Sequence, residues 1–272
     1  MSARDSDRFV VAPGTPFSLD SRNPADTSGA PGDKKATQKV LEDLSEELLS
    51  LQDRLYAESG QALLVVLQAM DAGGKDGTVK HVFAGSNPQG VRVTSFKQPT
   101  PEELAHDFLW RAHVAAPRRG FIGIFNRSYY EDVLVGRVRK LAPQDDIKKR
   151  YDQINAFEKI LFENGTTVLK FMLHISKKEQ RERLQARLDE PQSRWKFNPS
   201  DLDDRKLWDK FSAAYEIMLD KCSTPWAPWH VIPADRKWAR NAAIAAIVRE
   251  TLEEMNPQYP KPDWDPKSFV LK

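Results

Sequence analysis

The stretch "LLVVLQAMDAGGKDGTVKHVF", residues 63–83, indicates both the fold class and the place of the functional site. Its first half is a short apolar run, which is typical of a strand buried on both faces. Gly73, Gly74, Lys75 and Gly77 follow. Glycines permit the tight path on which backbone N–H groups surround a phosphate, and a lysine where a helix begins adds positive charge. The stretch is therefore interpreted as a strand, a phosphate-binding loop and a helix.

The loop departs at two positions from the common phosphate-loop pattern G-x-x-x-x-G-K-[ST]. Ala69 stands where the first glycine is expected, and Asp76 replaces the hydroxyl residue that usually contacts magnesium. Asp71 is a candidate for the missing metal ligand, because a carboxylate that faces a phosphate needs a divalent cation between them. The alternatives are an ordinary glycine-rich turn for the loop, and a turn or helix-capping role for Asp71 and Asp76.

Apolar runs and helical periodicity alternate along the rest of the chain. This order predicts a single α/β domain in three layers, with a five-stranded parallel sheet between helices. Ligands of such sheets bind beyond the carboxyl ends of the strands. The predicted strands are residues 62–69, 90–96, 120–125, 166–175 and 229–234. The predicted helices after the loop are residues 100–116, 128–141, 145–165, 176–188, 203–222 and 236–255, and another, 34–58, precedes the first strand.

The two ends of the chain have a different composition from the domain between them. Residues 1–33 are rich in Pro, Gly, Ser and Asp, which predicts a partly ordered arm draped over the domain. Residues 260–272 form a proline-rich tail that we expect to be irregular. The domain itself is expected to span residues 34–259.

Composition excludes several classes of protein. The 41 basic and 39 acidic residues give a net charge of +2, which predicts neither a nucleic-acid coat nor a membrane-surface protein. The single Cys222 excludes a disulfide framework within the chain and fits a reducing cytosol. No apolar run approaches the roughly 20 residues that span a bilayer. No apolar segment follows the charges near residue 1, so no signal peptide is expected. A soluble, cytoplasmic protein is the resulting expectation.

A second cluster of polar residues follows the predicted strand at residues 120–125. Arg127 would project at the ligand crevice, where its planar fork suits a phosphate. Glu131 and Asp132 are candidate metal or nucleotide contacts. The alternatives are a structural salt bridge for Arg127, and for the two acids the ordinary preference of a helix's first turn for carboxylates.

Several motifs in this order and spacing resemble one family. The segments "AMDAGGKDGT", "LWRAH", "IFNRSYYEDVLV", "HISKKEQ", "RWKF" and "VIPADRKWAR" are similar to the polyphosphate kinase 2 family, in the branch called class III. The resemblance covers residues from about 33 to 259. It implies a thymidylate kinase-like fold with a P-loop core and a helical lid, here at about residues 176–205. It also implies transfer of phosphoryl groups between inorganic polyphosphate and nucleotides with Mg²⁺.

The resemblance further implies roles for particular residues. Asn126 stands where many relatives have Asp, although class III relatives typically have Asn, and an amide binds Mg²⁺ less firmly than a carboxylate. Asn126 at this position therefore bears on whether a nucleoside monophosphate, a diphosphate or both act as phosphoryl acceptors. Glu131 is a candidate to restore the missing negative charge. Asp71 and Glu131 are the candidate metal ligands. The implied catalytic residues are Asp71, Lys75, Arg111, Asn126 and Arg127.

Basic residues elsewhere are candidates to hold the polyphosphate chain. Eight lie between Lys177 and Arg205. Such a run is usually a solvated helix face, but a lid that closes over phosphates must bring cations to them. A second row of cations, which includes Lys80 and Arg118, would hold a long anion such as polyphosphate. This binding would weaken as the salt concentration rises. The phosphate-binding candidates, those of the lid by resemblance, are Lys80, Arg118, Arg181, Arg187 and Lys196, beside the three loop glycines.

The remaining candidates concern the nucleotide. In P-loop kinases the segment after the last strand commonly contacts the base, which makes Asp235 and Lys237 candidates beside Glu131 and Asp132.

The favoured hypothesis is a magnesium-dependent polyphosphate:AMP/ADP phosphotransferase that produces ADP and ATP, or the guanine counterparts. Transfer would be direct and in line, because positioning and charge neutralisation supply most of the catalysis in such reactions. The alternatives are an ATP-dependent nucleoside monophosphate kinase and a non-catalytic nucleotide- or RNA-binding regulator. The expected partners are polyphosphate, AMP, ADP, ATP or guanine nucleotides, and further copies of the chain in a homo-oligomer. No nucleic acid or membrane is expected.

Overall fold

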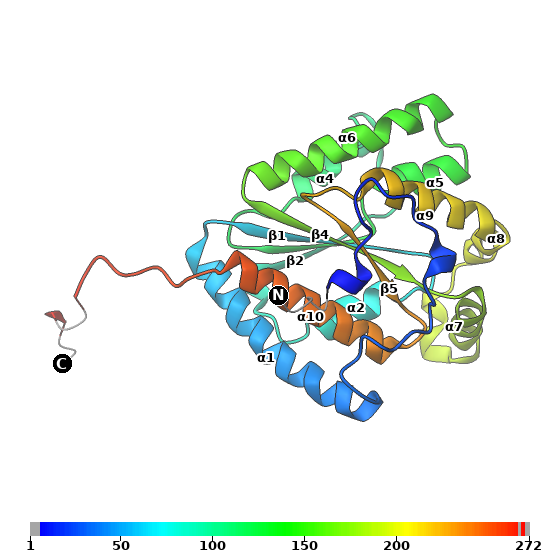
Figure 1. Cartoon of the computed structure of the whole chain (residues 1–272). Helices are drawn as coiled ribbons and strands as arrows, with labels where there is room; N and C mark the ends of the chain where they lie inside the picture. Colours follow the sequence, from blue (N-terminus) through cyan, green and yellow to red (C-terminus); the bar gives the residue numbers. More distant parts are fainter. Residues whose placement is uncertain (1–5, 266–267, 270–272) are drawn as a thin grey trace.

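A computed structural model describes residues 6–265 and 268–269 of the protein (Figure 1). The outermost residues of the expected arm and tail, 1–5, 266–267 and 270–272, lie outside the described part. Five strands form one parallel sheet in the order β2-β3-β1-β4-β5, which confirms the predicted sheet. The strands are β1 (Ala62–Ala69), β2 (Val91–Ser95), β3 (Ile122–Asn126), β4 (Thr166–His174) and β5 (Trp229–Pro233).

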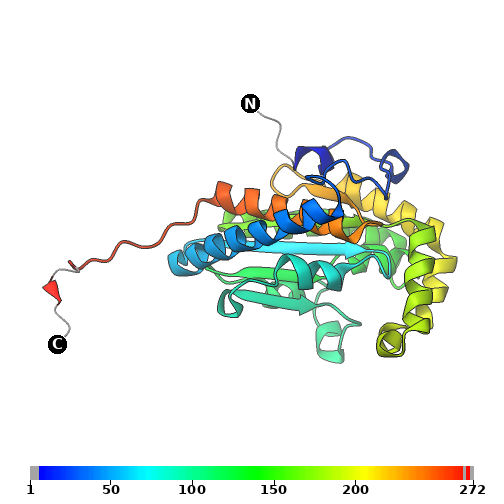
Figure 2. The same ribbon diagram turned by 90° about the horizontal axis from the view of Figure 1, so that it is seen from below.

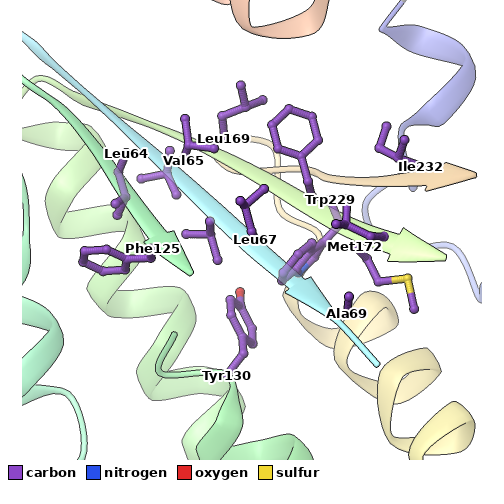
Figure 3. Packing of buried hydrophobic residues seen from close by; sticks show 14 of the residues in the cluster. Leu64, Val65, Leu67, Ala69, Phe125, Tyr130, Leu169, Met172, Trp229 and Ile232 are labelled. Atoms are coloured by element: carbon purple, nitrogen blue, oxygen red, sulfur yellow. The ribbon is translucent and has the colours of Figure 1, made fainter. Parts of the chain in front are cut away.

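Strand β1 is the centre of the sheet, between β3 and β4. All eight of its residues are buried, because helices cover both of its faces. In Figure 3, Leu64, Val65 and Leu67 pack with Phe125 of β3 and Trp229 of β5 in one apolar cluster. Burial on both faces explains why this segment is an unbroken apolar run rather than an alternating one.

Helices form a layer on each face of the sheet (Figures 1 and 2). One layer holds α1 (Lys34–Glu58), α2 (Lys75–Val82) and α10 (Lys237–Met255). The other layer holds α4 (Trp110–Ala115), α5 (Glu131–Val138), α6 (Gln144–Glu163) and α9 (Trp208–Cys222). Helices α7 (Lys177–Asp189) and α8 (Ser200–Lys206) stand at the end of the sheet to which the strands point (Figure 2). The carboxyl ends of the strands therefore face α7 and α8.

The helix predicted for residues 100–116 is wrong as a single element. The structure has α3 (Pro101–Leu104) and α4 instead, with residues 105–109 between them. Thr100 and Glu103 form a capping box at the start of α3. The break follows because the Asp107 side chain accepts the backbone N–H of Leu109 at 2.9 Å, a local bond that competes with helix continuation.

The helix predicted for residues 203–222 is also divided, into α8 and α9. The N–H of Leu207 bonds the carbonyl of Asp204 at 3.0 Å, which closes a tight turn at the end of α8. The polar interval 189–201 contains a 3₁₀ helix at Pro191–Lys196. The 3₁₀ helix and the turn at Leu207 both lie within the segment that stands at the carboxyl end of the sheet.

The expected arm packs on the folded body, while the tail leaves it. Short 3₁₀ helices at Asp7–Phe9 and Leu19–Ser21 bury Phe9 and Leu19. Beyond α10, the described part of the tail runs away from the other elements (Figure 1). Among the described residues, every helix is too short or too polar to cross a bilayer.

Candidate active site

The loop between β1 and α2 has the left-handed backbone that a phosphate cradle requires. Ala72 and Gly74 have positive φ values, 57° and 108°. A Cβ at Gly74 would collide with the guanidinium of Arg240, and one at Gly73 would lie 2.6 Å from the Cβ of Ala69. Glycine is therefore required at both positions. Gly74 is the N-cap of α2, so the first N–H groups of that helix face the loop.

Lys75 begins α2 and folds back over its own loop. Its Nζ donates to the carbonyl oxygen of Ala69 at 2.9 Å, and the side chain is buried. Burial lowers the pKa of Lys75 to about 8, and the charge of Arg127 acts in the same direction against the nearby carboxylates. The ammonium is thus a desolvated cation, for which an incoming phosphate oxygen would be a better partner than a carbonyl.

Arg127 lies between two carboxylates at the carboxyl end of β3. Its Nη2 donates to Oδ1 of Asp71 at 2.8 Å, and its Nη1 lies 3.4 Å from Oε2 of Glu131. Burial opposes the charge, but Glu131 and Asp71 outweigh it and raise the pKa of Arg127. The predicted convergence of Asp71, Lys75, Arg127 and Glu131 is what the structure shows.

A buried network fixes the backbone beside Arg127. This residue has a φ of 61°, which is unusual for a side chain other than glycine. Tyr129 and Tyr130 are fully buried and donate to Oε1 of Glu158 at 2.8 and 2.7 Å. Nζ of Lys170 bonds Oε2 of Glu158 at 2.6 Å and compensates its charge. The strained conformation is therefore held by the packing that follows it.

Asn126 is paired with Asp76 in the first turn of α2. Its Nδ2 donates to Oδ1 of Asp76 at 2.6 Å. The amide of Asn126 thus supplies a donor where the carboxylate of an Asp would face a like charge. Asp76 is bound through its side chain to β3, rather than acting only as a helix-capping residue.

The oxygen atoms around Arg127 suit a hard divalent cation. Nε2 of Gln68 donates to Glu131 at 3.1 Å, whereas the buried Oε1 of Gln68 has no hydrogen-bond partner. No group of three His, Cys, Asp or Glu side chains with metal-binding geometry occurs in the described residues. Mg²⁺ takes one or two carboxylates and completes its shell with water and substrate phosphates. Asp71 and Glu131 fit that pattern.

Arg111 and Asp132 form a separate ion pair next to this group. Nη1 of Arg111 donates to the carbonyl oxygen of Lys97 at 2.9 Å, and its Nη2 lies 3.7 Å from Oδ2 of Asp132. Nη1 of Arg150 lies 3.5 Å from the other oxygen of Asp132. Burial raises the pKa of Asp132 in spite of the two arginines. The charge of Glu131 acts on Asp132 in the same direction as burial, so these two carboxylates are near neighbours.

The cations predicted for the lid are not those that reach the loop. Arg181 and Lys196 are exposed, and Arg187 lies 3.4 Å from Asp201. Arg183 of α7, which the sequence did not single out, donates to the carbonyls of Ala72 and Gly73 at 3.0 and 3.2 Å. It also donates to the carbonyl of Ala234 at 2.6 Å.

Arg240 is a second cation that the sequence analysis missed. It is buried, and its guanidinium donates to the Asn241 side chain and, at 3.3 Å, to the carbonyl of Gly73. Burial and then Arg183 lower its pKa to about 9. Lys237, one helical turn earlier, has its pKa lowered by burial and by the same two arginines. The spacing of Lys237 and Arg240 on one helix face was the signal available in the sequence.

Of three further candidates, Lys80 and Arg118 lie apart from this group. Lys80 is exposed on α2. Arg118 precedes β3 and stacks on Phe121 with 4.2 Å to the ring centroid, at the amino end of the sheet. A cation there cannot join the loop, because the loop lies at the opposite ends of the strands. Oδ1 of Asp235 accepts the N–H of Ser176 at 2.8 Å, so its side chain is bound to the start of α7.

A cleft opens between the loop and helices α5, α8 and α9. One wall carries the charged group around Arg127, and the other wall is largely aromatic. Asp204 of α8 reaches the cleft and is bound by Arg139. The cleft residues used below are Asp71, Arg127, Glu131, Trp208, Phe211 and Tyr215.

Comparison with known proteins agrees with this geometry. The family model described as polyphosphate kinase 2 matches residues 32–260. The chain belongs to this family. It is 52% identical over 265 residues to the AMP/ADP-polyphosphate phosphotransferase of Meiothermus ruber, covering 97% of this chain and 99% of that protein. It is 44% identical over 240 residues to the ADP-polyphosphate phosphotransferase of Rhodopseudomonas palustris, covering 84% and 83%.

A solved structure supports the same assignment. The crystal structure of polyphosphate kinase 2 from Arthrobacter aurescens TC1 superposes with a TM-score of 0.94 at 42% identity, covering 98% of this chain and 95% of that one. The resemblance to the polyphosphate kinase 2 family that the motifs indicated is therefore confirmed.

Proposed function

We propose that this chain transfers phosphoryl groups from inorganic polyphosphate to AMP and ADP, with GMP and GDP as further acceptors, and that it uses Mg²⁺. The observation that carries the proposal is the meeting of Lys75 and Arg127 with Asp71 at the carboxyl ends of β1 and β3. Two cations beside a metal-binding carboxylate suit the charge of a transferring phosphoryl group. The names of the Meiothermus and Rhodopseudomonas relatives supply the donor and acceptor classes.

The donor is assigned to the loop side of the site. Polyphosphate carries about one charge per phosphate, so it needs cations beyond the reacting end. Lys75 would exchange its bond to Ala69 for the terminal phosphate. Arg183, Lys237 and Arg240 surround the loop on the α7 and α10 side and would continue the positive path.

The acceptor is assigned to the opposite side, where Arg127 lines the cleft and Arg111 is paired with Asp132 of α5, a helix that borders the cleft. Arg127 would exchange a carboxylate contact for the attacking phosphate of the nucleotide. Trp208, the least buried of the three aromatic residues at the cleft, offers a surface on which a base can stack. Glu131 and Asp132 remain candidate nucleotide contacts, and Asn126 is proposed to permit both acceptor lengths.

Asp71 and Glu131 would hold the Mg²⁺, with the Oε1 atom of Gln68 nearby. A bound divalent cation neutralises charge on the phosphate oxygens of donor and acceptor. Asp71 and Glu131 now share Arg127, so binding of the substrates would redistribute these contacts.

Transfer is proposed to be direct. An oxygen of the acceptor's terminal phosphate forms a bond to the terminal phosphorus of polyphosphate. The bridging P–O bond breaks, and the polyphosphate leaves one phosphate shorter. Lys75 and Arg127 neutralise the charge on the oxygens during transfer, and no covalent intermediate on the protein is required. We also propose that residues 176–205 act as a lid over a core spanning residues 34–259.

The decisive assay incubates AMP or ADP with long-chain polyphosphate and Mg²⁺ and follows ATP by luminescence. We expect ATP from both acceptors, and none without polyphosphate. Phosphorylation of AMP with ATP alone as donor would instead identify a nucleoside monophosphate kinase. Nucleotide binding without turnover would identify a regulator. Light scattering after size-exclusion chromatography tests the proposed homo-oligomer.

A further inference from the structure

The N-terminal arm packs along the edge of the sheet at β5 (Figure 1). Val10 pairs with His230 as an antiparallel bridge, and the N–H of Val11 donates to the carbonyl of Trp229 at 2.8 Å. Phe9 and Val11 are buried. The arm is therefore a packed part of the fold.

Two carboxylates of α9 fix the next part of the arm. Oδ1 of Asp220 accepts the N–H of Phe17 at 2.6 Å. Oε1 of Glu216 accepts the N–H of Leu19 at 2.8 Å and the hydroxyl of Ser18 at 3.0 Å. Neither carboxylate contacts the loop, so both can be changed without altering the proposed site directly.

The arm then reaches the carboxyl ends of β4 and β5. Nε2 of His174 lies 3.1 Å from the carbonyl of Arg22, which can only accept, so this nitrogen is the donor. The N–H of Asp235 donates to the carbonyl of Pro24 at 3.0 Å. Two backbone carbonyls of the arm thus hold both strand ends on this side of the site.

Asp235 connects the arm to the phosphate loop. Its Oδ1 accepts the N–H of Ser176, the N-cap of α7, and its carbonyl accepts from Arg183 at 3.1 Å. The same guanidinium donates to the loop carbonyl of Ala72 at 3.0 Å. A continuous chain of hydrogen bonds therefore runs from Pro24 through Asp235 and Arg183 to the loop.

We infer that Asp235 is a positioning residue for the phosphate loop and that the strap, residues 17–24, holds it in place. Resting on the proposed function, the inference assigns the strap to the polyphosphate side of the site, since α7, Arg183 and the loop all lie there. Loosening the strap releases the ends of β4 and β5 together and lets Arg183 leave the loop carbonyls. Affinity for polyphosphate then falls, while nucleotide binding across the cleft is unaffected.

The first test loosens the strap from outside the site with the double variant Glu216→Ala/Asp220→Ala. We expect the KM for polyphosphate to rise about five- to tenfold, the scale of one lost hydrogen bond, with the KM for ADP unchanged. Asp145→Ala, which removes an exposed carboxylate on α6, is the control and should match the wild type. An unchanged KM for polyphosphate in the double variant would overturn the role of the strap.

The second test separates positioning from base contact and from simple capping. Asp235→Ala should raise the KM for polyphosphate, and Asp235→Asn should restore it, because the amide oxygen still accepts the N–H of Ser176. A rise in the KM for ADP alone would make Asp235 a nucleotide contact instead. A lower melting temperature with both KM values unchanged would make it an ordinary cap, and either result overturns the inference.

Hydrogen exchange gives a readout that does not depend on turnover. Both Asp235→Ala and the double variant should speed amide exchange at residues 70–77 and 176–183 while leaving β1 protected. If the wild-type chain fails to use polyphosphate but the variants still exchange faster at these residues, the proposed function is refuted and the positioning role stands. Exchange at wild-type rates would refute the positioning role itself.

Discussion

The buried ammonium of Lys75 should make the reaction sensitive to mildly alkaline pH. Its pKa is lowered from 10.5 to about 8, by burial first and then by Arg127, while Asp71, Glu131 and Asp76 oppose the shift. The charged form is the one that faces phosphate. The free enzyme should therefore lose activity as the pH rises through about 8.

The size of the loss follows from the fraction of Lys75 that is charged. A pKa of about 8 leaves about 90% of it charged at pH 7 and about 10% at pH 9. Since kcat/KM reports ionisation in the free enzyme, we expect it to fall about tenfold between these two values. The decline in kcat should come at higher pH, because bound polyphosphate favours the ammonium. Initial rates of ATP formation at low and at saturating polyphosphate measure both profiles.

Two variants decide whether Lys75 is the titrating group. Lys75→Arg keeps a charge that does not titrate near pH 8, so the decline centred on about pH 8 should vanish even if the rate is lower. Lys75→Ala should reduce kcat by about 100-fold or more. A flat wild-type profile, or a decline that persists in Lys75→Arg, would refute the reasoning.

The same shift has a consequence for stability with a definite sign. The folded pKa lies below the unfolded value of 10.5, so the fold favours the neutral amine. The cost of burying the ammonium is fully present below about pH 8 and disappears as the pH rises towards 10.5. Lys75→Met should therefore melt at no lower temperature than the wild type at pH 7, and a clearly lower temperature would contradict this account.

Three other variants test the remaining contacts. Asp71→Asn should lower activity about tenfold or more and weaken its Mg²⁺ dependence, with a nearly unchanged melting temperature. Lost stability with full specific activity would instead assign Asp71 to a turn or cap. Asn126→Asp should shift the ratio of kcat/KM for AMP and ADP roughly fivefold, because a second carboxylate then faces Asp76. An equal ratio in steady-state kinetics would make Asn126 structural. Lys170→Met should cost about 3–5 kcal/mol in urea unfolding by leaving Glu158 unpaired, and adding Glu158→Gln should recover most of it. A small loss in the single variant would contradict the account of Lys170 and Glu158 as a stabilising buried pair.

The sequence predicted the sheet because buried parallel strands leave an unmistakable apolar signal. The run at residues 62–69 has no polar face, so neither a surface helix nor an edge strand fits it. The breaks at residues 105–109 and at Leu207 were missed, because a local hydrogen bond and a tight turn end those helices without disturbing the hydrophobic spacing.

The convergence of Asp71, Lys75 and Arg127 could be predicted because all three follow parallel strands that end at one edge. Arg183 and Arg240 could not, since they reach the loop only through the packing of α7 and α10. The direction of β3 was also sufficient to separate Arg118 from the loop, because a residue before a strand lies at its amino end.

The hydrogen bond between Asn126 and Asp76 joins one departure from the common phosphate-loop pattern to an amide at the end of the neighbouring strand. The carboxylate of this pair stands in the first turn of α2, and its neutral partner stands at the end of β3. The pair therefore places one negative charge between these two elements, with a donor beside it. The acid after the loop lysine and the amide after the neighbouring strand therefore act as one hydrogen-bonded unit in this chain, and neither position alone is a sign of a degenerate, inactive loop.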